Sequence, residues 1–271
     1  AIARIVAISA TSFVAAILVM PFWIRLLRRW HMGKSIRDAA SAPIMAKLHA
    51  AKVGTPTMGG LVIWATVVFL LLFYRTACYF NTPLVCKLSF LSRAQTRLPL
   101  GILIAAGMIG LLDDYLNVRR IGPRGGGLRM RFRLLSYTLV ALAGAWWFFS
   151  RLEWDFVHVP FLGTFNIGWW YLPFFVLVVV ATSFSVNETD GLDGLAGGPL
   201  MTSFGAMALI AWSQGRIDLA SFSVAILGAL LAFLWYNVPP ARVFMGDTGA
   251  MALGTVLAAV AMITNTALLL P

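Results

Sequence analysis

Long runs of uncharged, mostly apolar residues recur along the whole of this 271-residue chain. Most of them have about the 17 to 25 residues that an α-helix needs to cross the hydrocarbon core of a bilayer. The third run is shorter, and we expect it to extend to Leu116, with Asp113 and Asp114 at its polar end. We predict eight membrane-spanning helices, over residues 5–24, 58–74, 98–112, 134–150, 167–187, 194–215, 219–241 and 248–271.

The composition supports a membrane protein. Hydrophobic residues make up 60% of the chain and charged residues 11%, and the mean hydropathy is +0.86. These values are far from the averages of soluble domains. The predicted fold class is therefore all-α: a polytopic transmembrane helix bundle that forms a single domain over residues 1–271, with no soluble domain attached.

The basic residues predict the orientation of the bundle, because Lys and Arg are enriched in cytoplasmic loops. If the N-terminus lies outside, the cytoplasmic loops 25–57, 113–133 and 236–247 carry 14 basic residues, and the outer side carries 7. The net charge of +11 then reflects topology and an attraction for anionic lipids or nucleotides. Nothing in the chain indicates a nucleic-acid partner.

Two features are predicted for the outer surface. Short alternating runs on both sides of Gly163 favour a small β-hairpin near residues 156–167. Cys78 and Cys86 both lie in the loop 75–97, where the compartment permits a disulfide. Spacing alone does not distinguish that disulfide from two free thiols.

The chain has only ten acidic residues, and six of them lie in three short clusters at the edges of apolar runs. Charge is costly near hydrocarbon, so charged residues at such edges indicate a functional site. The clusters are Asp113 and Asp114, then Glu188, Asp190 and Asp193, then Asp247. Brought together on the cytoplasmic side, they predict a magnesium site, and magnesium in turn suggests a phosphate-containing substrate.

The clusters differ in their local sequence. Adjacent residues on a helix point about 100° apart, so one of Asp113 and Asp114 is expected to face the phosphates or metal and the other a basic or backbone partner. Asp190 and Asp193 would share one side of a helix if that segment is helical. Asp247 begins the last helix after Gly246, and its alternative role is a helix cap.

Three further segments are candidates for binding anions or bases. Lys52 and Thr57 precede a Gly59-Gly60 pair at the start of the second helix, where free N–H groups favour phosphate; the alternative is an ordinary helix start with a close helix contact. Arg129 and Arg133, in a strongly basic loop, would attract a lipid phosphate, although topogenic charge explains most such arginines. Phe244 would stack on a nucleobase or simply pack.

In order and spacing, these segments resemble the polyprenyl-phosphate N-acetylhexosamine-1-phosphate transferases. The matching motifs are TPTMGG at 55–60, DDY at 113–115, NETDGLDGLA at 187–196 and VFMGD at 243–247. The resemblance covers essentially the whole chain, and the TPTMGG form favours the muramoyl-pentapeptide branch over the N-acetylglucosamine-1-phosphate branch. Asn117 and Glu188 depart from the family pattern, which usually has a basic and an apolar residue there.

The resemblance implies a magnesium-dependent enzyme of the bacterial inner membrane, active on the cytoplasmic face and often homodimeric. It would transfer phospho-MurNAc-pentapeptide from UDP to undecaprenyl phosphate within the lipid bilayer. Asp247 would bind the metal, and Asp113, Asp114 and Asp193 would be needed for activity. The residues that would line the nucleotide or phosphate region are Lys52, Thr57, Asn187, Asp190, Asp193, Asn237 and Phe244.

Two other functions are compatible with parts of this pattern. A sister enzyme that uses UDP-N-acetylglucosamine would share every catalytic residue named above. An ion-coupled transporter would also place carboxylates in a helix bundle, but near the bilayer midplane and on broken helices, whereas here they lie at one edge among glycines and basic residues. The family continues beyond the position of Pro271 through a His-rich loop and two more helices, so we expect the domain to lack these.

Overall fold

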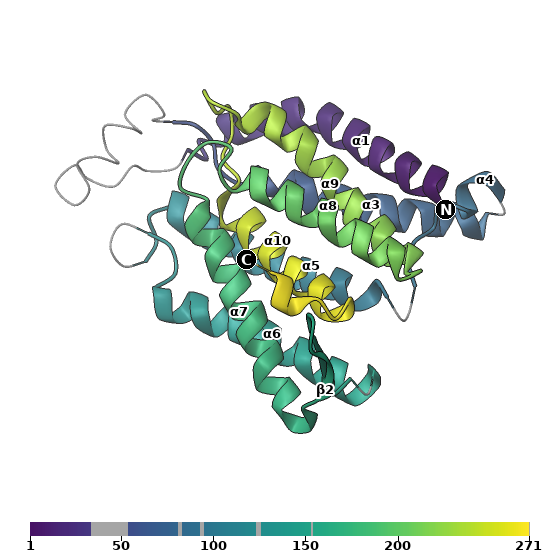
Figure 1. Ribbon diagram of the computed structural model, residues 1–271. Coiled ribbons are helices and arrows are strands. Elements are labelled where there is room, and N and C mark those ends of the chain that lie inside the picture. Colours follow the sequence, from purple (N-terminus) through teal and green to yellow (C-terminus); the bar gives the residue numbers. More distant parts are fainter. Residues whose placement is uncertain (34–53, 81–82, 93–94, 123–125, 153, 271) are drawn as a thin grey trace.

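The computed structural model describes residues 1–33, 54–80, 83–92, 95–122, 126–152 and 154–270, and it consists mainly of long helices (Figure 1). Helices satisfy their own backbone hydrogen bonds, as a segment surrounded by hydrocarbon requires. The main helices are α1 Ile2–Arg29, α3 Gly60–Tyr79, α5 Arg97–Val118, α6 Met130–Leu152, α7 Tyr171–Thr189, α8 Gly197–Ser213, α9 Ile217–Asn237 and α10 Gly246–Ile263. Shorter pieces are α4 Pro83–Cys86 and two 3₁₀ turns, Gly168–Trp170 and Ala267–Leu269.

Each of the eight predicted spans overlaps one of these long helices, and the polytopic helical fold class is confirmed. Within the described ranges, seven helices are long and apolar enough to cross a membrane. The remaining helix, α8, is equally apolar and has 17 residues, the lower limit of spanning length. The chain is therefore a polytopic helical membrane protein.

Helix α10 forms the centre of the bundle and packs most extensively on α5 and α7. Every residue from Thr248 to Ile263 is buried. Small residues allow this close packing: a Cβ on Gly60 would collide with the backbone of Gly249, and one on Gly110 with the backbone of Asp247. Such small-residue contacts are the usual way in which transmembrane helices approach each other. They bring the first turn of α10 directly against α3 and α5.

Some predicted boundaries were wrong. The last span ends at Ile263 and not at residue 271, because the chain turns at Asn265, which has a positive φ of 54°. The Asn265 side chain accepts the His158 N–H at 2.9 Å and so fixes this turn. Helix α5 continues through Asp113 and Asp114 to Val118, two residues beyond the expected limit.

The predicted hairpin is present. Strand β1 Phe156–Val159 pairs antiparallel with β2 Gly163–Asn166, and Phe156 lies opposite Asn166. The hairpin projects from the helices between α6 and α7 (Figure 1). His158 is exposed and contacts the Thr164 hydroxyl across the hairpin.

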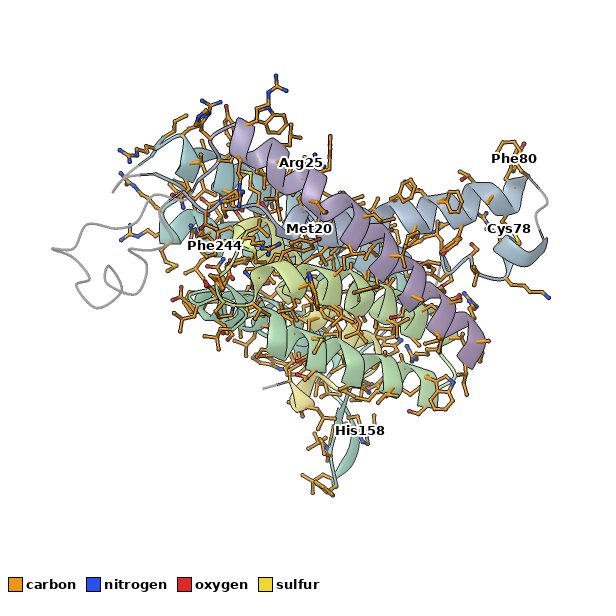
Figure 2. All side chains as sticks on the ribbon, turned by 90° about the horizontal axis from the view of Figure 1, so that it is seen from above. Met20, Arg25, Cys78, Phe80, His158 and Phe244 are labelled. Atoms are coloured by element: carbon orange, nitrogen blue, oxygen red, sulfur yellow. A yellow bond between two sulfur atoms is a disulfide. The ribbon has the colours of Figure 1, made fainter. Side chains whose placement is uncertain are left out.

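Cys78 and Cys86 form a disulfide that joins the end of α3 to α4. The alternative of two free thiols is therefore wrong. Figure 2 shows Cys78 and Phe80 toward one end of the bundle and Arg25 and Phe244 toward the other. The disulfide and the segment around Phe244, which carries the last sequence motif, thus lie at opposite ends of the helices, as the predicted topology requires.

Candidate active site

The three acidic clusters, far apart in sequence, meet around the N-terminus of α10. Asp114 on α5 accepts the backbone N–H of Thr248 at 2.9 Å and the Thr248 hydroxyl at 2.7 Å, both on Oδ2. Asp190, just after α7, accepts the N–H of Gly246 at 3.1 Å. The first turn of a helix has unsatisfied N–H groups and a positive dipole end, both of which attract carboxylates. Asp247 lies in that same turn.

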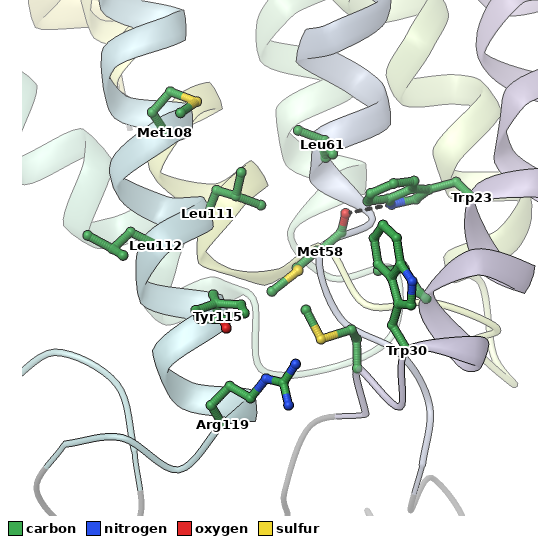
Figure 3. Close-up of a pocket in the computed structure, with 11 residues that line it drawn as sticks. Trp23, Trp30, Met58, Leu61, Met108, Leu111, Leu112, Tyr115 and Arg119 are labelled. Carbon is green, nitrogen blue, oxygen red and sulfur yellow. Dashed lines mark hydrogen bonds between the residues drawn. The ribbon is translucent and has the colours of Figure 1, made fainter.

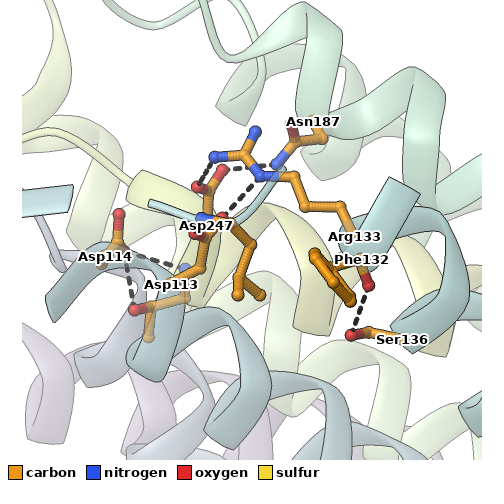
Figure 4. A network of polar contacts seen from close by, with 9 residues as sticks. Asp113, Asp114, Phe132, Arg133, Ser136, Asn187 and Asp247 are labelled. Carbon is orange, nitrogen blue, oxygen red and sulfur yellow. Dashed lines mark hydrogen bonds and ion pairs between the residues drawn. The ribbon is translucent and has the colours of Figure 1, made fainter. Parts of the chain in front are cut away.

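Arg133 on α6 joins two of these clusters (Figure 4). Its Nε lies 2.6 Å from Oδ2 of Asp113, and its Nη2 lies 2.8 Å from Oδ2 of Asp247. The other oxygens are also held: Asn187 Nδ2 donates to Oδ1 of Asp247 at 2.6 Å, and the Leu128 N–H donates to Oδ1 of Asp113 at 2.5 Å. Helices α5, α6, α7 and α10 thus contribute to one charged cluster.

The two adjacent aspartates have different partners, as their angular separation on a helix predicts. Asp113 faces the basic Arg133, and Asp114 faces the start of α10. Both side chains are buried, with exposures of 0% and 1%. Buried carboxylates are costly unless they are paired or hydrogen-bonded, and here each has such partners.

Several buried polar atoms around this cluster lack a hydrogen-bond partner within the described ranges. They include the Thr57 and Tyr137 hydroxyls and Nε of Arg133, whose contact with Asp113 is an ion pair without hydrogen-bond alignment. Buried polar groups normally have partners, so such atoms indicate a place for a polar ligand or water. Tyr137 interacts electrostatically with Asp247 and Arg133.

The sequence analysis missed Tyr137. A single tyrosine inside an apolar run resembles a core residue, and the protein does bury it, with 1% exposure. The available signal was its spacing of four residues from Arg133, which places both side chains on one face of α6.

Asp193 and Asn237 contact backbone groups in the loops beside the cluster. Asp193 accepts the Ala241 N–H at 3.2 Å. Asn237 accepts the Gly194 N–H and donates to the Val243 carbonyl, each at 2.9 Å. Asp190 and Asp193 were predicted to share one side of a helix if their segment is helical. The segment after α7 is instead a series of turns, so that condition is not met. Asp190 and Asp193 hold the loop after α7 against the loop that leads into α10.

The backbone N–H groups at the start of α3, which were predicted to bind an anion, are already hydrogen-bonded within the protein. The Gly59 and Gly60 N–H groups donate to the carbonyls of Phe244 and Met245 at 2.8 and 2.9 Å, so they are not available to a phosphate. The alternative of a close helix contact at this glycine pair is confirmed. The N–H of half-buried Phe244 donates to the Pro56 carbonyl at 2.8 Å. Lys52 lies outside the described residues.

The two arginines proposed for lipid attraction occupy different environments. Arg133 is within the charged cluster, whereas Arg129 is exposed near the beginning of α6. Arg129 contributes its backbone carbonyl, which accepts the Phe132 and Arg133 N–H groups. The structure therefore brings Arg133, but not the Arg129 side chain, into contact with the acidic residues in the described part of the chain.

A separate apolar pocket of about 640 Å³ lies between α1, α3 and α5 (Figure 3). Trp23, Met58 and Tyr115 line it, and Arg119 is its one charged lining residue among those described. None of the clustered aspartates lines this pocket. Its surface suits a hydrocarbon chain better than a nucleotide, so the chemistry is expected in the charged cluster and not here.

The cluster fits a magnesium ion on chemical grounds. No group of three His, Cys, Asp or Glu side chains suited to a metal occurs within the described segments. Mg²⁺, however, usually binds one or two carboxylates and takes its remaining ligands from waters and substrate phosphates. Asp113 and Asp247 already share one cation, the Arg133 guanidinium. The Thr57 and Tyr137 hydroxyls, which have no hydrogen-bond partner in the described part of the chain, are further polar oxygens around the cluster.

Comparison with known proteins shows the family to which this chain belongs. The model of glycosyl transferase family 4 matches residues 97–265, which contain all three acidic clusters. The phospho-N-acetylmuramoyl-pentapeptide-transferase of Chloroflexus aurantiacus is 38% identical over 99% of this chain and 70% of its own length. Those of Geobacillus thermodenitrificans and Shouchella clausii are each 40% identical, over 98% and 96% of this chain and 77% and 74% of theirs. The chain belongs to glycosyl transferase family 4 and, within it, to the phospho-N-acetylmuramoyl-pentapeptide transferases.

Proposed function

We propose that the protein transfers phospho-N-acetylmuramoyl-pentapeptide from its UDP derivative to undecaprenyl phosphate in the membrane, releasing UMP. The observation that carries this proposal is the meeting of Asp113, Arg133 and Asp247 in one buried cluster at one end of a membrane-spanning bundle. An arrangement of both charge signs at a membrane edge suits the transfer of phosphoryl groups between a soluble and a lipid-bound substrate.

The reaction exchanges one phosphoanhydride for another. An oxygen of the lipid phosphate attacks the phosphorus that carries the sugar, and the bond from that phosphorus to the oxygen of UMP breaks. The second pKa of a phosphate monoester is about 6, so the lipid phosphate is largely dianionic at neutral pH and needs no strong base. Direct proton abstraction by an aspartate, or a covalent aspartyl-phosphate, are weaker alternatives.

The main requirement is therefore control of charge. Arg133 offers a guanidinium suited to phosphate oxygens, and it pairs with Asp113 and Asp247. Asn187 orients Asp247 through its 2.6 Å hydrogen bond, while Asp114 and Asp190 fix the turn that carries Asp247. Thr57, Asp193, Asn237 and Phe244 are proposed to line the nucleotide region beside this turn.

Asp247, with Asp113 beside it, is the proposed site of Mg²⁺. When bound, such an ion neutralises negative charge on the pyrophosphate and stabilises the departing UMP. The carboxylates supply the hard oxygen ligands that this ion prefers.

The proposed location is the bacterial plasma membrane, with the cluster on the cytoplasmic side. In a Cys78→Ser/Cys86→Ser background, a membrane-impermeant maleimide should leave Arg129→Cys unlabelled in intact cells and label it after permeabilisation. In the parent protein, Cys78 should react from outside once the disulfide has been reduced. Labelling of Arg129→Cys from outside would show that the orientation is inverted.

We also propose a homodimer, which a solution mass of twice 29.6 kDa would show.

The activity is tested by measuring UMP release from UDP-MurNAc-pentapeptide. Release is expected only when undecaprenyl phosphate and Mg²⁺ are both present. UDP-N-acetylglucosamine serves as the matched donor. UMP release with this donor but not with UDP-MurNAc-pentapeptide would identify the sister activity. No release with either donor, from protein that remains folded, would refute the proposed function.

A further inference from the structure

We propose that Arg133 is a built-in counter-cation for the metal site: it occupies the cation position between Asp113 and Asp247 until a divalent ion binds, and is then released toward the phosphate of the lipid substrate. The inference rests on the proposed function, because it assumes a metal site at these carboxylates. It goes further by assigning Arg133 two positions and by making the metal and the guanidinium competitors.

The first support is the way in which the two carboxylates are held. Each has one oxygen anchored by an uncharged donor: Oδ1 of Asp113 by the Leu128 N–H and Oδ1 of Asp247 by Asn187. Each directs its other oxygen, Oδ2, at Arg133. If Arg133 moved away, the anchored oxygens would keep both carboxylates in place, with two Oδ2 atoms directed at the vacated position.

The second support is the charge requirement of the site. Asp113 is fully buried, and the Asp247 side chain is only 13% exposed. Two facing carboxylates in such surroundings repel each other strongly unless a cation lies between them. Among the ion pairs that the structure describes, Arg133 is the one cation that bridges two carboxylates. The site therefore contains a positive charge before any metal arrives.

The third support is the kind of contact that holds Arg133 to Asp113. The Arg133 side chain is 21% exposed, and it projects from the first turns of α6 on a long, flexible stem. Its Nε has no aligned hydrogen bond in the described part of the protein, although it is buried. The contact with Asp113 thus depends mainly on charge. A divalent ion displaces a guanidinium from such a contact more readily than from a bidentate, fully hydrogen-bonded pair with a carboxylate.

Displacement would couple metal binding to capture of the second substrate. The N–H donors of a guanidinium that leaves two carboxylates become available to other partners, and arginine is well suited to planar bidentate recognition of phosphate. Arg133 would then meet the anionic lipid phosphate after the metal has bound. In this scheme Arg133 is a residue that contacts substrate, while Asp113 and Asp247 position it in the metal-free state.

The test measures binding of Mn²⁺, as a paramagnetic substitute for Mg²⁺, to the purified full chain without substrate by electron paramagnetic resonance. Arg133→Gln removes the competing cation, and we expect Mn²⁺ to bind about tenfold more tightly, a modest part of the Coulomb energy of charges in contact. Arg131→Gln is the matched control, because it removes the same charge from an exposed position two residues away and should leave the affinity unchanged. Asp247→Asn should weaken binding.

Unchanged or weaker Mn²⁺ binding by Arg133→Gln, with a wild-type affinity that still depends on Asp247, would overturn the inference and leave the proposed metal site intact. An affinity that Asp247→Asn does not change would overturn the metal site and the inference with it. If Arg133→Gln fails to fold, Arg133→Met replaces it: methionine keeps a long unbranched stem but carries no charge, so Mn²⁺ should bind more tightly than to wild type. No increase with methionine would also refute the proposal.

Lipid dependence supplies a second readout. Once metal is saturating, the KM of Arg133→Gln for undecaprenyl phosphate should rise by about tenfold or more, as expected for loss of a hydrogen bond to a charged group, while its KM for the UDP-linked donor changes little. A residue that only stabilised the fold would affect both substrates alike. A selective rise in the donor KM would contradict release of Arg133 toward the lipid phosphate.

Discussion

Asp247→Asn is expected to lower the rate of UMP release by about two to four decades while the protein remains folded. Metal assistance contributes several kcal/mol to such reactions, and each decade corresponds to about 1.4 kcal/mol. The amide keeps the shape of the side chain, so the Asn187 contact and the first turn of α10 persist. It loses the charge that pairs with Arg133 and that would bind Mg²⁺. Magnesium titrations of UMP release measure both the maximal rate and the magnesium concentration at half-saturation.

Asp218→Asn is a close control for this change. Asp218 also lies in the first turn of a helix, α9, and also pairs with an arginine, Arg4, at 2.6 Å. It is at the other end of the bundle, so its loss should leave the rate and the magnesium dependence nearly unaffected. A rate of Asp247→Asn within a few-fold of wild type, with an unchanged magnesium half-saturation, would move the metal elsewhere, first to the loop containing Asp190 and Asp193.

Asp113→Asn should lower transfer by about two to three decades, comparable to removal of one electrostatic group from an active site. The carboxylate of Asp113 contacts Arg133 and is fully buried, so its charge acts on the cluster without screening by water. An amide at this position leaves the Leu128 N–H with an oxygen acceptor. Turnover with saturating substrates and the thermal unfolding midpoint together separate loss of chemistry from loss of fold.

Asp114→Asn is the paired experiment, because the neighbouring residue has a different environment. The Thr248 N–H and hydroxyl both donate to one Asp114 oxygen, and the amide oxygen of asparagine accepts the same two bonds. We therefore expect the fold to persist. Transfer should still fall by about one decade or more, which corresponds to about 1.4 kcal/mol, because the amide lacks the negative charge beside the first turn of α10. Near-normal turnover in either variant at neutral pH would show that the residue concerned has only a structural role.

The membrane fold and its secondary elements were largely predictable from local pattern. The spans follow from runs of apolar residues, the hairpin from alternation around Gly163, and the candidate site from charge placed at the edges of those runs. The errors arise where a specific hydrogen bond from a distant part of the chain overrides what the local sequence pattern predicts. A turn fixed by a hydrogen bond from His158 to Asn265 ends the last helix early, and carbonyls at residues 244 and 245 take the N–H groups expected to bind an anion.

What the sequence by itself determined is that the chain crosses the membrane repeatedly and that carboxylates gather at one face, because hydrocarbon tolerates neither unpaired backbone nor scattered charge. What only the tertiary structure decided is which carboxylate faces what. Asp113 and Asp114 are neighbours in the chain, yet one joins Arg133 and Asp247 and the other holds the start of α10. Those partners come from helices that are distant in sequence, and close packing at Gly60 and Gly110 brings them together.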